Sequence, residues 1–109
     1  MSRPRVRYAT IFVFPSPGKG KPPVVTTTPQ RLTARPGDVI DWTVVNATGS
    51  GAKVTVAFPK GSPLKGRSGK PFDRWVRDDV RSKVEDGLYK YDVLIDGQVV
   101  FDPEIEIMR

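Results

Sequence analysis

The chain has 109 residues, of which 18 are lysine or arginine and 12 are aspartate or glutamate, so its formal net charge is +6. It contains no histidine and no cysteine. It therefore lacks the side chains preferred by soft or borderline metals, which are also those most used as nucleophile or general base near neutral pH. The length predicts a single domain over residues 1–109, with a hydrophobic core that needs no disulfides.

In the first predicted strand, successive residues can be assigned alternately to two faces. Between residues 5 and 14, Tyr8 and Phe12 fall on one face, and Ala9 and Ile11 fall on the other. A period of two is typical of a β-strand with one face toward a core. We therefore predict a strand over residues 5–14.

Prolines and glycines predict the breaks that follow. Residues 15–23 lack backbone donors at their prolines and are predicted to form an exposed loop. Short strands are expected at residues 24–28 and 31–34, with Pro29 between them. Residues 35–38 are a predicted turn, because proline followed by glycine suits a tight change of direction.

The middle of the chain is predicted to hold two more strands. In residues 39–46 and in residues 53–58, large apolar side chains recur at every second position. The turn residues between the two segments favour a hairpin. Prolines, glycines and lysines argue against regular structure in residues 59–71. Apolar residues then recur at four-residue steps over residues 72–84, which suits one side of a short helix, although irregular chain fits residues 82–86 equally well.

The C-terminal part has the clearest signals. We predict a strand over residues 88–95, then a two-residue hairpin turn at Asp96 and Gly97, a type of turn that this pair favours. Strands over residues 98–101 and 104–108 complete the chain. About seven short strands with at most one short helix predict an all-β fold, a Greek-key β-sandwich.

Two stretches of the chain resemble a cupredoxin. The first spans residues 30–58 and contains the run RPGDVIDWTVVN at residues 35–46, followed by a loop and the run VTV. The second is GLYKYDV at residues 87–93, which a closing strand at residues 102–107 follows. The resemblance implies a cupredoxin-like, or plastocyanin-like, β-sandwich.

The same resemblance implies where copper ligands would stand. Cupredoxins have a histidine at the start of the strand after the asparagine-containing loop, which corresponds to Ala52 or Lys53, and a cysteine that corresponds to a position near Val93. The remaining ligands would fall in residues 94–99, which read as an ordinary hairpin. A blue-copper site needs imidazole and thiolate ligands. We therefore predict no copper, no other metal and no cofactor.

Catalytic patterns are weak throughout the chain. Residues 61–68 approach a phosphate-binding loop with Arg67 in place of its lysine, but Pro63 and the all-β surroundings favour a flexible basic loop. Asp78 and Asp79 are neighbours in the chain, so in a strand they point to opposite faces and cannot act as a pair. We predict no catalytic residue and expect that the protein is not an enzyme.

The distribution of charge along the chain is the remaining feature that points to a function. Residues 1–37 carry seven basic residues and no acid, whereas residues 84–109 carry two basic and seven acidic residues. Basic surfaces attract polyanions and acidic proteins. The candidate contacts to a polyanion or a partner are Arg3, Arg5, Arg7, Lys19, Lys21, Arg31, Arg35, Lys65, Arg67 and Lys70.

The sequence thus predicts a non-enzymatic, metal-free, cupredoxin-like interaction or structural module, which could be a subunit of a larger assembly. Its partner would be another protein or a second copy, since the basic N-terminal segment of one copy can meet the acidic C-terminal strand of another, or an open edge strand can pair. The alternative is sequence-independent binding of nucleic acid through the basic N-terminal strand and the loops.

The sequence also carries a prediction about location. No apolar run approaches the length of a membrane span, and the basic residues 1–7 are not followed by the apolar region of a secretion signal. We therefore expect no membrane partner and a cytoplasmic protein, unless a leader has been removed.

Overall fold

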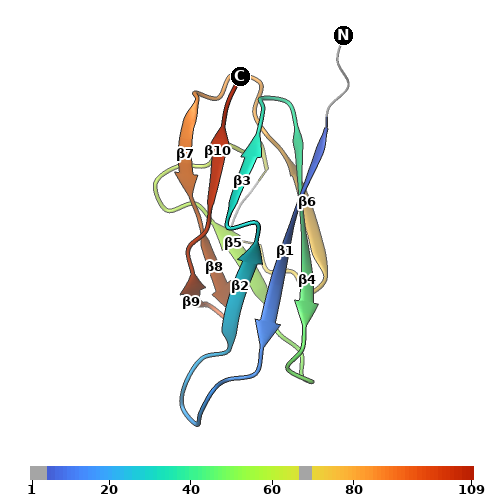
Figure 1. The fold of residues 1–109 in the computed structure, drawn as a ribbon, viewed down its shortest axis with the longest axis vertical. Helices are drawn as coiled ribbons and strands as arrows, with labels where there is room; N and C mark the ends of the chain where they lie inside the picture. The colour runs from blue at the N-terminus through green and yellow to red at the C-terminus, as the bar shows by residue number, and fades with distance from the viewer. Residues whose placement is uncertain (1–4, 67–69) are drawn as a thin grey trace.

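A computed structural model describes residues 5–66 and 70–109. Over these ranges the chain forms ten β-strands and no helix (Figure 1). The strands are β1 (Val6–Phe14), β2 (Val24–Thr28), β3 (Arg31–Ala34), β4 (Val39–Asn46), β5 (Val54–Ala57), β6 (Trp75–Asp79), β7 (Gly87–Lys90), β8 (Asp92–Ile95), β9 (Gln98–Phe101) and β10 (Glu104–Ile107).

One layer of the fold is a four-stranded sheet in the order β2-β1-β4-β6. Its central strands β1 and β4 run parallel, with Val6 opposite Val39 and Val13 opposite Asn46. The outer strands β2 and β6 each run antiparallel to their neighbour. Parallel strands need a crossover, and here β3 supplies it from the other layer.

Two three-stranded sheets make up the second layer, in the orders β3-β10-β7 and β5-β8-β9. Tyr91 alone separates β7 from β8, so the two sheets follow one another along the length of the molecule (Figure 1). From β2 to β7 the chain passes back and forth between the layers. The result is the expected all-β sandwich.

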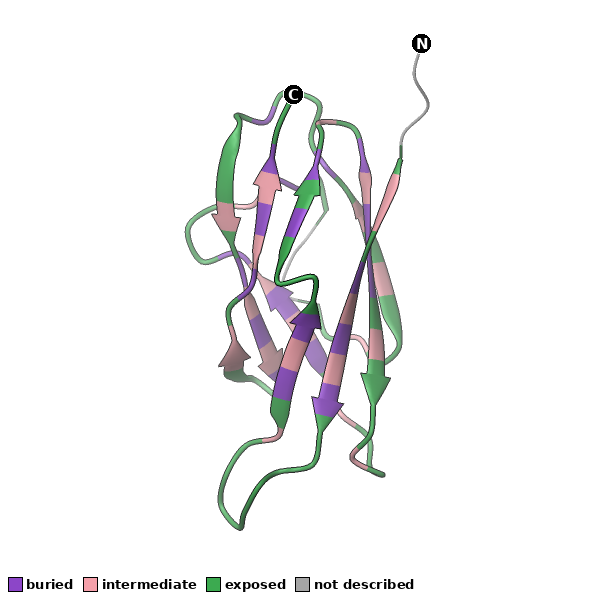
Figure 2. Ribbon diagram, in the orientation of Figure 1, coloured by how far each residue is buried: buried purple, intermediate pink, exposed green. Residues whose placement is uncertain are grey.

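The hydrophobic core lies between the layers. In Figure 2 the buried positions alternate with more exposed ones along the strands, as expected where one sheet face packs inward. The core takes Ile11 and Ile40 from the four-stranded sheet, and Val93, Ile105 and Ile107 from the second layer, and all of these are fully buried.

The two tight turns predicted from the sequence are confirmed. Gly37 has a φ of 87° and the Asp38 N–H donates to the carbonyl of Arg35 over 3.0 Å. Asp96 and Gly97 have φ values of 49° and 85°, the left-handed conformations that a two-residue hairpin turn requires. The second turn joins β8 to β9 as an antiparallel hairpin.

The predicted helix over residues 72–84 is wrong, because this segment contains β6. A four-residue spacing is a multiple of two, so it fits the inward face of a strand as well as one side of a helix. The bridge that joins Phe72 to Val54 shows how the segment is held against the second layer. With β6, and with the predicted strand over residues 88–95 divided in two, the described residues form ten strands where about seven were expected.

Two predicted pairings also differ from the structure. The segments 39–46 and 53–58 do not form a hairpin, since β4 pairs with β1 and β6 while β5 pairs with β8. The predicted strand over residues 88–95 is divided at Tyr91 into β7 and β8, which pair with different neighbours. Turn residues in the sequence predict pairing between strands that are neighbours in the chain. The strands here pair with more distant ones, which lets the two layers bury their inner faces against each other.

Candidate functional site

The structure brings together the two segments where the cupredoxin resemblance implies copper ligands. Lys53 and Asp96 exchange hydrogen bonds: the Lys53 N–H donates to Asp96 Oδ1 over 3.0 Å, and the Asp96 N–H donates to the Lys53 carbonyl over 2.8 Å. Next to them, Val56 lies opposite Val93 in the β5–β8 pair. The end of the sandwich where a cupredoxin would hold copper is therefore closed by hydrogen bonds between Lys53 and Asp96.

A hollow of about 360 Å³ lies at this end of the molecule. Its lining residues are Pro15, Ser16, Lys21, Pro23, Thr48, Ser50, Gly51, Ala52, Ile95 and Asp96. The polar groups mainly hold the loops: Ser16 Oγ donates to the Lys21 carbonyl over 2.7 Å, and the Thr48 N–H donates to Asn46 Oδ1 over 2.9 Å. With no imidazole or thiolate, this lining does not fit a blue-copper ion.

No cluster of three or more histidine, cysteine or acidic residues occurs in the part of the chain that the structure describes. Asp92, Asp96 and Asp102, which lie in β8 or directly after β8 and β9, are not part of such a cluster.

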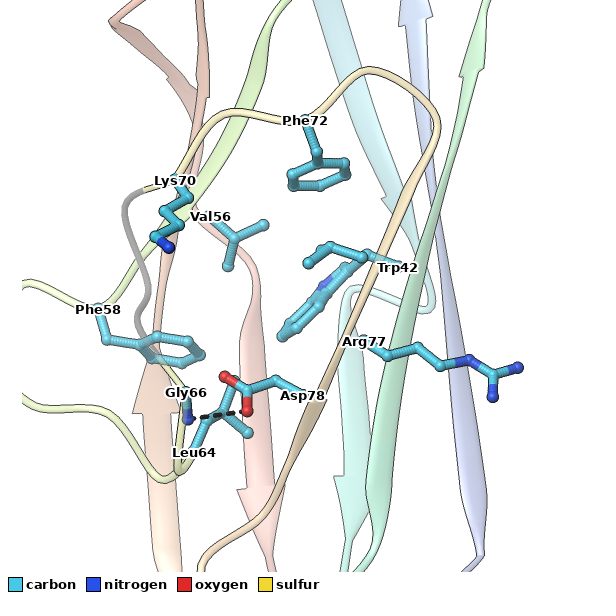
Figure 3. Close-up of a pocket in the computed structure, with 10 residues that line it drawn as sticks. Trp42, Val56, Phe58, Leu64, Gly66, Lys70, Phe72, Arg77 and Asp78 are labelled. Atoms are coloured by element: carbon cyan, nitrogen blue, oxygen red, sulfur yellow. Dashed lines mark hydrogen bonds between the residues drawn. The ribbon is translucent and has the colours of Figure 1, made fainter.

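A second cavity, of about 150 Å³, opens between the layers beside β6 (Figure 3). Its walls are mainly apolar and include Trp42, Phe58 and Phe72. Asp78 enters it from β6, whereas Arg77 extends away on the other side of the strand (Figure 3). Arg77 and Asp78 therefore point to opposite faces of the sheet, as neighbouring residues of a strand do.

The Asp78 carboxylate is held by backbone donors at the cavity wall. Asp78 Oδ1 accepts the N–H of Gly66 and of Asp79, each over 2.8 Å. A β-carbon on Gly66 would overlap this carboxylate, so the close approach requires glycine. Burial raises the pKa of Asp78 above its ordinary value, while the two N–H donors oppose the shift. The sequence has no histidine that could share its proton.

The outward side of the four-stranded sheet carries an unusual set of side chains, which we call the aromatic face. Its large apolar members are Tyr8, Phe12, Phe14, Val24, Val45 and Trp75. Tyr8 and Trp75 are 60% and 61% exposed, although rings of this size gain free energy by leaving water. Phe12 and Phe14 stack on one another with ring centroids 6.3 Å apart.

An ion pair lies within the aromatic face. Arg77 Nε donates to Asp41 Oδ2 over 2.6 Å, and the hydroxyl of Thr43 donates to Asp41 Oδ1 over 3.1 Å. The hydrogen bond to Asp41 raises the pKa of Arg77. The Arg77 guanidinium carbon also lies 5.9 Å from the ring centroid of Trp75. These contacts hold the charged pair against the sheet and leave Trp75 projecting.

The opposite layer provides a comparison. On the sheet β3-β10-β7 the outward positions are mainly charged, and the Arg31 guanidinium lies 2.7 Å from Glu104 Oε1. Lys90 is the residue opposite Glu104 on the other side. This is an ordinary solvated surface. The aromatic face therefore differs in composition from the outward side of this sheet.

The predicted basic contacts do not come together in one patch. Arg5 and Arg35 lie at the end where β1 begins, and their N–H groups both reach the Asp38 carboxylate, over 3.4 Å and 2.9 Å. Lys19 and Lys21 lie in the β1–β2 loop at the opposite end of a molecule 51 Å long (Figure 1).

The other predicted contacts lie between these ends or outside the described ranges. Arg7 is in β1, Arg31 is paired with Glu104, and Lys65 and Lys70 lie in the segments that border the cavity beside β6. The predicted contacts Arg3 and Arg67 lie outside the described residues.

Sequence reasoning missed the aromatic face although part of its signal was present. The alternation in β1 places Tyr8, Phe12 and Phe14 on one side, but the other side is apolar too, so the pattern does not say which one is buried. Trp75 lies in the segment whose spacing also suits a helix. The strand register was needed to bring these rings onto one surface.

No protein-family model and no curated protein matches the sequence. Within the described residues, no helix is long and apolar enough to cross a membrane.

Solved structures do match, and cupredoxins are among them. The oxidised plastocyanin of Dryopteris crassirhizoma aligns with a TM-score of 0.53 and 14% identity, over 91% of this chain and 99% of the plastocyanin. A purple cupredoxin from Nitrosopumilus maritimus aligns with a TM-score of 0.51 and 14% identity, over 91% of this chain and 98% of that protein. The chain therefore has a cupredoxin-like fold, in a sequence that lacks the histidine and cysteine ligands of a blue-copper site.

Proposed function

We propose that this protein is a non-enzymatic, metal-free interaction module that docks a protein partner on its aromatic face. The observation that carries the proposal is the exposure of Tyr8 and Trp75 on the same side of one sheet. Clustered tryptophan, tyrosine and arginine side chains are typical of the residues that dominate binding at protein interfaces. Arg77, pinned between Asp41 and Trp75, completes that composition.

The wider distribution of apolar side chains supports the same surface. The large hydrophobic residues that remain exposed in the described chain are Tyr8, Phe14, Val24, Val45, Trp75, Leu88, Val99 and Met108. All but the last three belong to the aromatic face. Single exposed apolar residues are normal on proteins, whereas a contiguous group marks a binding surface.

A photo-crosslinking residue at position 75 tests the proposal in cells. We expect Trp75→p-benzoylphenylalanine to give covalent adducts with a protein, because the partner would cover this position. The matched control is Leu88→p-benzoylphenylalanine, which places the same group on the opposite layer at a residue that is 50% exposed. Absence of adducts from position 75, or equal adducts from both positions, would refute docking on the aromatic face.

Binding of an oligonucleotide separates this proposal from the nucleic-acid alternative. If basic residues neutralised phosphates, affinity for mixed-sequence RNA or DNA would fall steeply as salt rises. The proposed module should show no micromolar binding at physiological salt in fluorescence anisotropy. Tight, salt-sensitive binding that weakens when Arg5 and Arg7 are replaced by alanine would support the alternative instead.

A further inference from the structure

The strand register arranges the aromatic face in rows. Tyr8, Asp41 and Arg77 lie opposite one another across β1, β4 and β6. The next row along β1 and β4 places Thr10 beside Thr43, with Trp75 opposite Thr43. Further along, Phe12 is flanked by Thr26 and Val45, and Phe14 by Val24. The rows form one continuous surface across four strands.

This surface is almost free of net charge. Among the outward positions of its four strands, the charged residues are Asp41, Arg77 and Asp79. Asp41 and Arg77 neutralise one another through a 2.6 Å contact. The chain as a whole carries a net charge of +6, so the surplus charge lies elsewhere, including the basic residues at the two ends of the molecule.

A largely neutral and apolar surface selects its partner by shape and apolar character. A strongly acidic partner or a nucleic acid would find little charge to pair with here, apart from an arginine already engaged by Asp41. A surface of matching chemistry is the aromatic face itself. Two sheets can pack face to face about 10 Å apart, and a two-fold axis brings the same patch of each copy together.

The flat outline of the face is somewhat smaller than the area that such an interface buries, and the projecting rings enlarge its accessible surface. Nine residues of β1 extend about 30 Å, and four strands span nearly 20 Å from edge to edge at about 4.8 Å spacing. A stable interface buries roughly 800 Å² on each partner, much of it contributed by large rings. The four aromatic side chains of the face supply the kind of residue that such an interface needs.

We infer that the aromatic face is the interface of a two-fold symmetric homodimer. This inference rests on the proposed function and names its partner as a second copy of the chain. The dimer differs from one in which the basic N-terminal segment of one copy meets the acidic C-terminal strand of another. Contacts between opposite charges weaken as salt rises, whereas salt strengthens the face-to-face dimer because it screens repulsion between two copies of net charge +6.

Sedimentation velocity of the purified chain over a range of concentrations, at low and moderate salt, tests the inference. We expect a reversible dimer whose dissociation constant decreases as salt is added. Trp75→Ser should weaken dimerisation at least about tenfold, as loss of a central aromatic residue does. Leu88→Ser is the matched control on the opposite layer and should leave the dissociation constant unchanged. Circular dichroism confirms that both variants fold.

Trp75 also provides a direct readout of the interface, because Trp42 is buried and Trp75 is exposed. In an NMR spectrum that resolves the indole N–H groups of both tryptophans, the chemical shift of Trp75 should change with protein concentration, while that of Trp42 should stay the same. A chain that stays monomeric at high concentration, or a dimer that Trp75→Ser leaves intact, would overturn the inference. A monomer that still forms adducts with another protein from position 75 would leave the proposed function standing.

Discussion

The indole N–H of Trp42 donates to the hydroxyl of Tyr91 over 3.2 Å, and the two rings meet edge to face with centroids 5.7 Å apart. Trp42 belongs to the four-stranded sheet, and Tyr91 is the residue at which β7 gives way to β8. One contact therefore joins the two layers at the point where the second layer changes from one sheet to the other.

Removing the hydroxyl of Tyr91 should destabilise the fold. In Tyr91→Phe the buried Trp42 N–H loses its acceptor, which should lower the free energy of unfolding by about 1–3 kcal/mol. Urea unfolding measures the change. Tyr89→Phe is the matched control, because Tyr89 donates to the Glu85 carbonyl at an exposed site and its loss should cost less. Equal effects of the two changes would contradict the assigned role of Tyr91.

The Tyr91 phenol should also govern stability at high pH. Burial raises its pKa to about 12, while the hydrogen bond from Trp42 opposes the shift. The unfolded chain loses the phenolic proton near pH 10, so stability should fall as the pH rises from there toward 12. Urea midpoints across this range should fall less in Tyr91→Phe than in the wild type. Parallel curves would show that Tyr91 is not the group responsible.

The two tryptophans should respond differently to truncation. Trp42 is 2% exposed and fills the centre of the core, so Trp42→Ala should cost roughly 3–5 kcal/mol of unfolding free energy. Trp75 is 61% exposed, so Trp75→Ala should leave the stability of the folded monomer within about 0.5 kcal/mol. Urea unfolding at low protein concentration compares them. A large loss at Trp75 would mean that its ring supports the fold itself.

Thr27 offers a stabilising substitution. Its side chain is buried at 1% exposure, and its hydroxyl finds no hydrogen-bond partner among the described residues. Thr27→Val keeps the branched shape and removes the unpaired polar group, so it should raise the free energy of unfolding by about 1 kcal/mol. Thermal unfolding followed by circular dichroism reports the change. A lower melting temperature would show that the hydroxyl does have a partner.

Ionisation of Asp78 should lower the free energy of unfolding as the pH rises, whereas most carboxylates in folded proteins have the opposite effect. Because the folded chain keeps the Asp78 proton to a higher pH than the unfolded chain, whose carboxyl titrates near 3.8, ionisation of this group favours unfolding. The stability of the wild type relative to Asp78→Asn should therefore fall as the pH rises above 3.8, and level off once the folded carboxyl is ionised. If the stability of the wild type relative to Asp78→Asn rose with pH instead, the pKa of Asp78 would be lowered in the folded chain and not raised.

Local patterns are enough to predict most strands and two of the turns. Strict alternation locates β1 and β4, and the pair Asp96 and Gly97 locates the β8–β9 hairpin. They are insufficient where the signal depends on distant partners. The spacing of Phe72 and Val76 suits two periodicities, and pairing with β4 decides between them.

The candidate site is harder to predict than the fold. The absence of histidine and cysteine argues by itself against a blue-copper site at Val93 and Lys53, because that site depends on residue types and not on their arrangement. The aromatic face depends on which side of β1 is buried and on a register that brings Tyr8 and Trp75 to one surface. Both are properties of pairing, so composition and periodicity cannot supply them.

The hydrogen bonds between Lys53 and Asp96 have a consequence for protein engineering. These hydrogen bonds close the end of the sandwich where a cupredoxin would hold copper. The two-residue turn at Asp96 and Gly97 then leads the chain directly into β9. Introducing histidine at Ala52 and cysteine at Val93 would supply two ligands and leave no loop to carry the others. A designer who wished to make this scaffold carry electrons would have to lengthen the turn at Asp96 and Gly97 as well as change side chains.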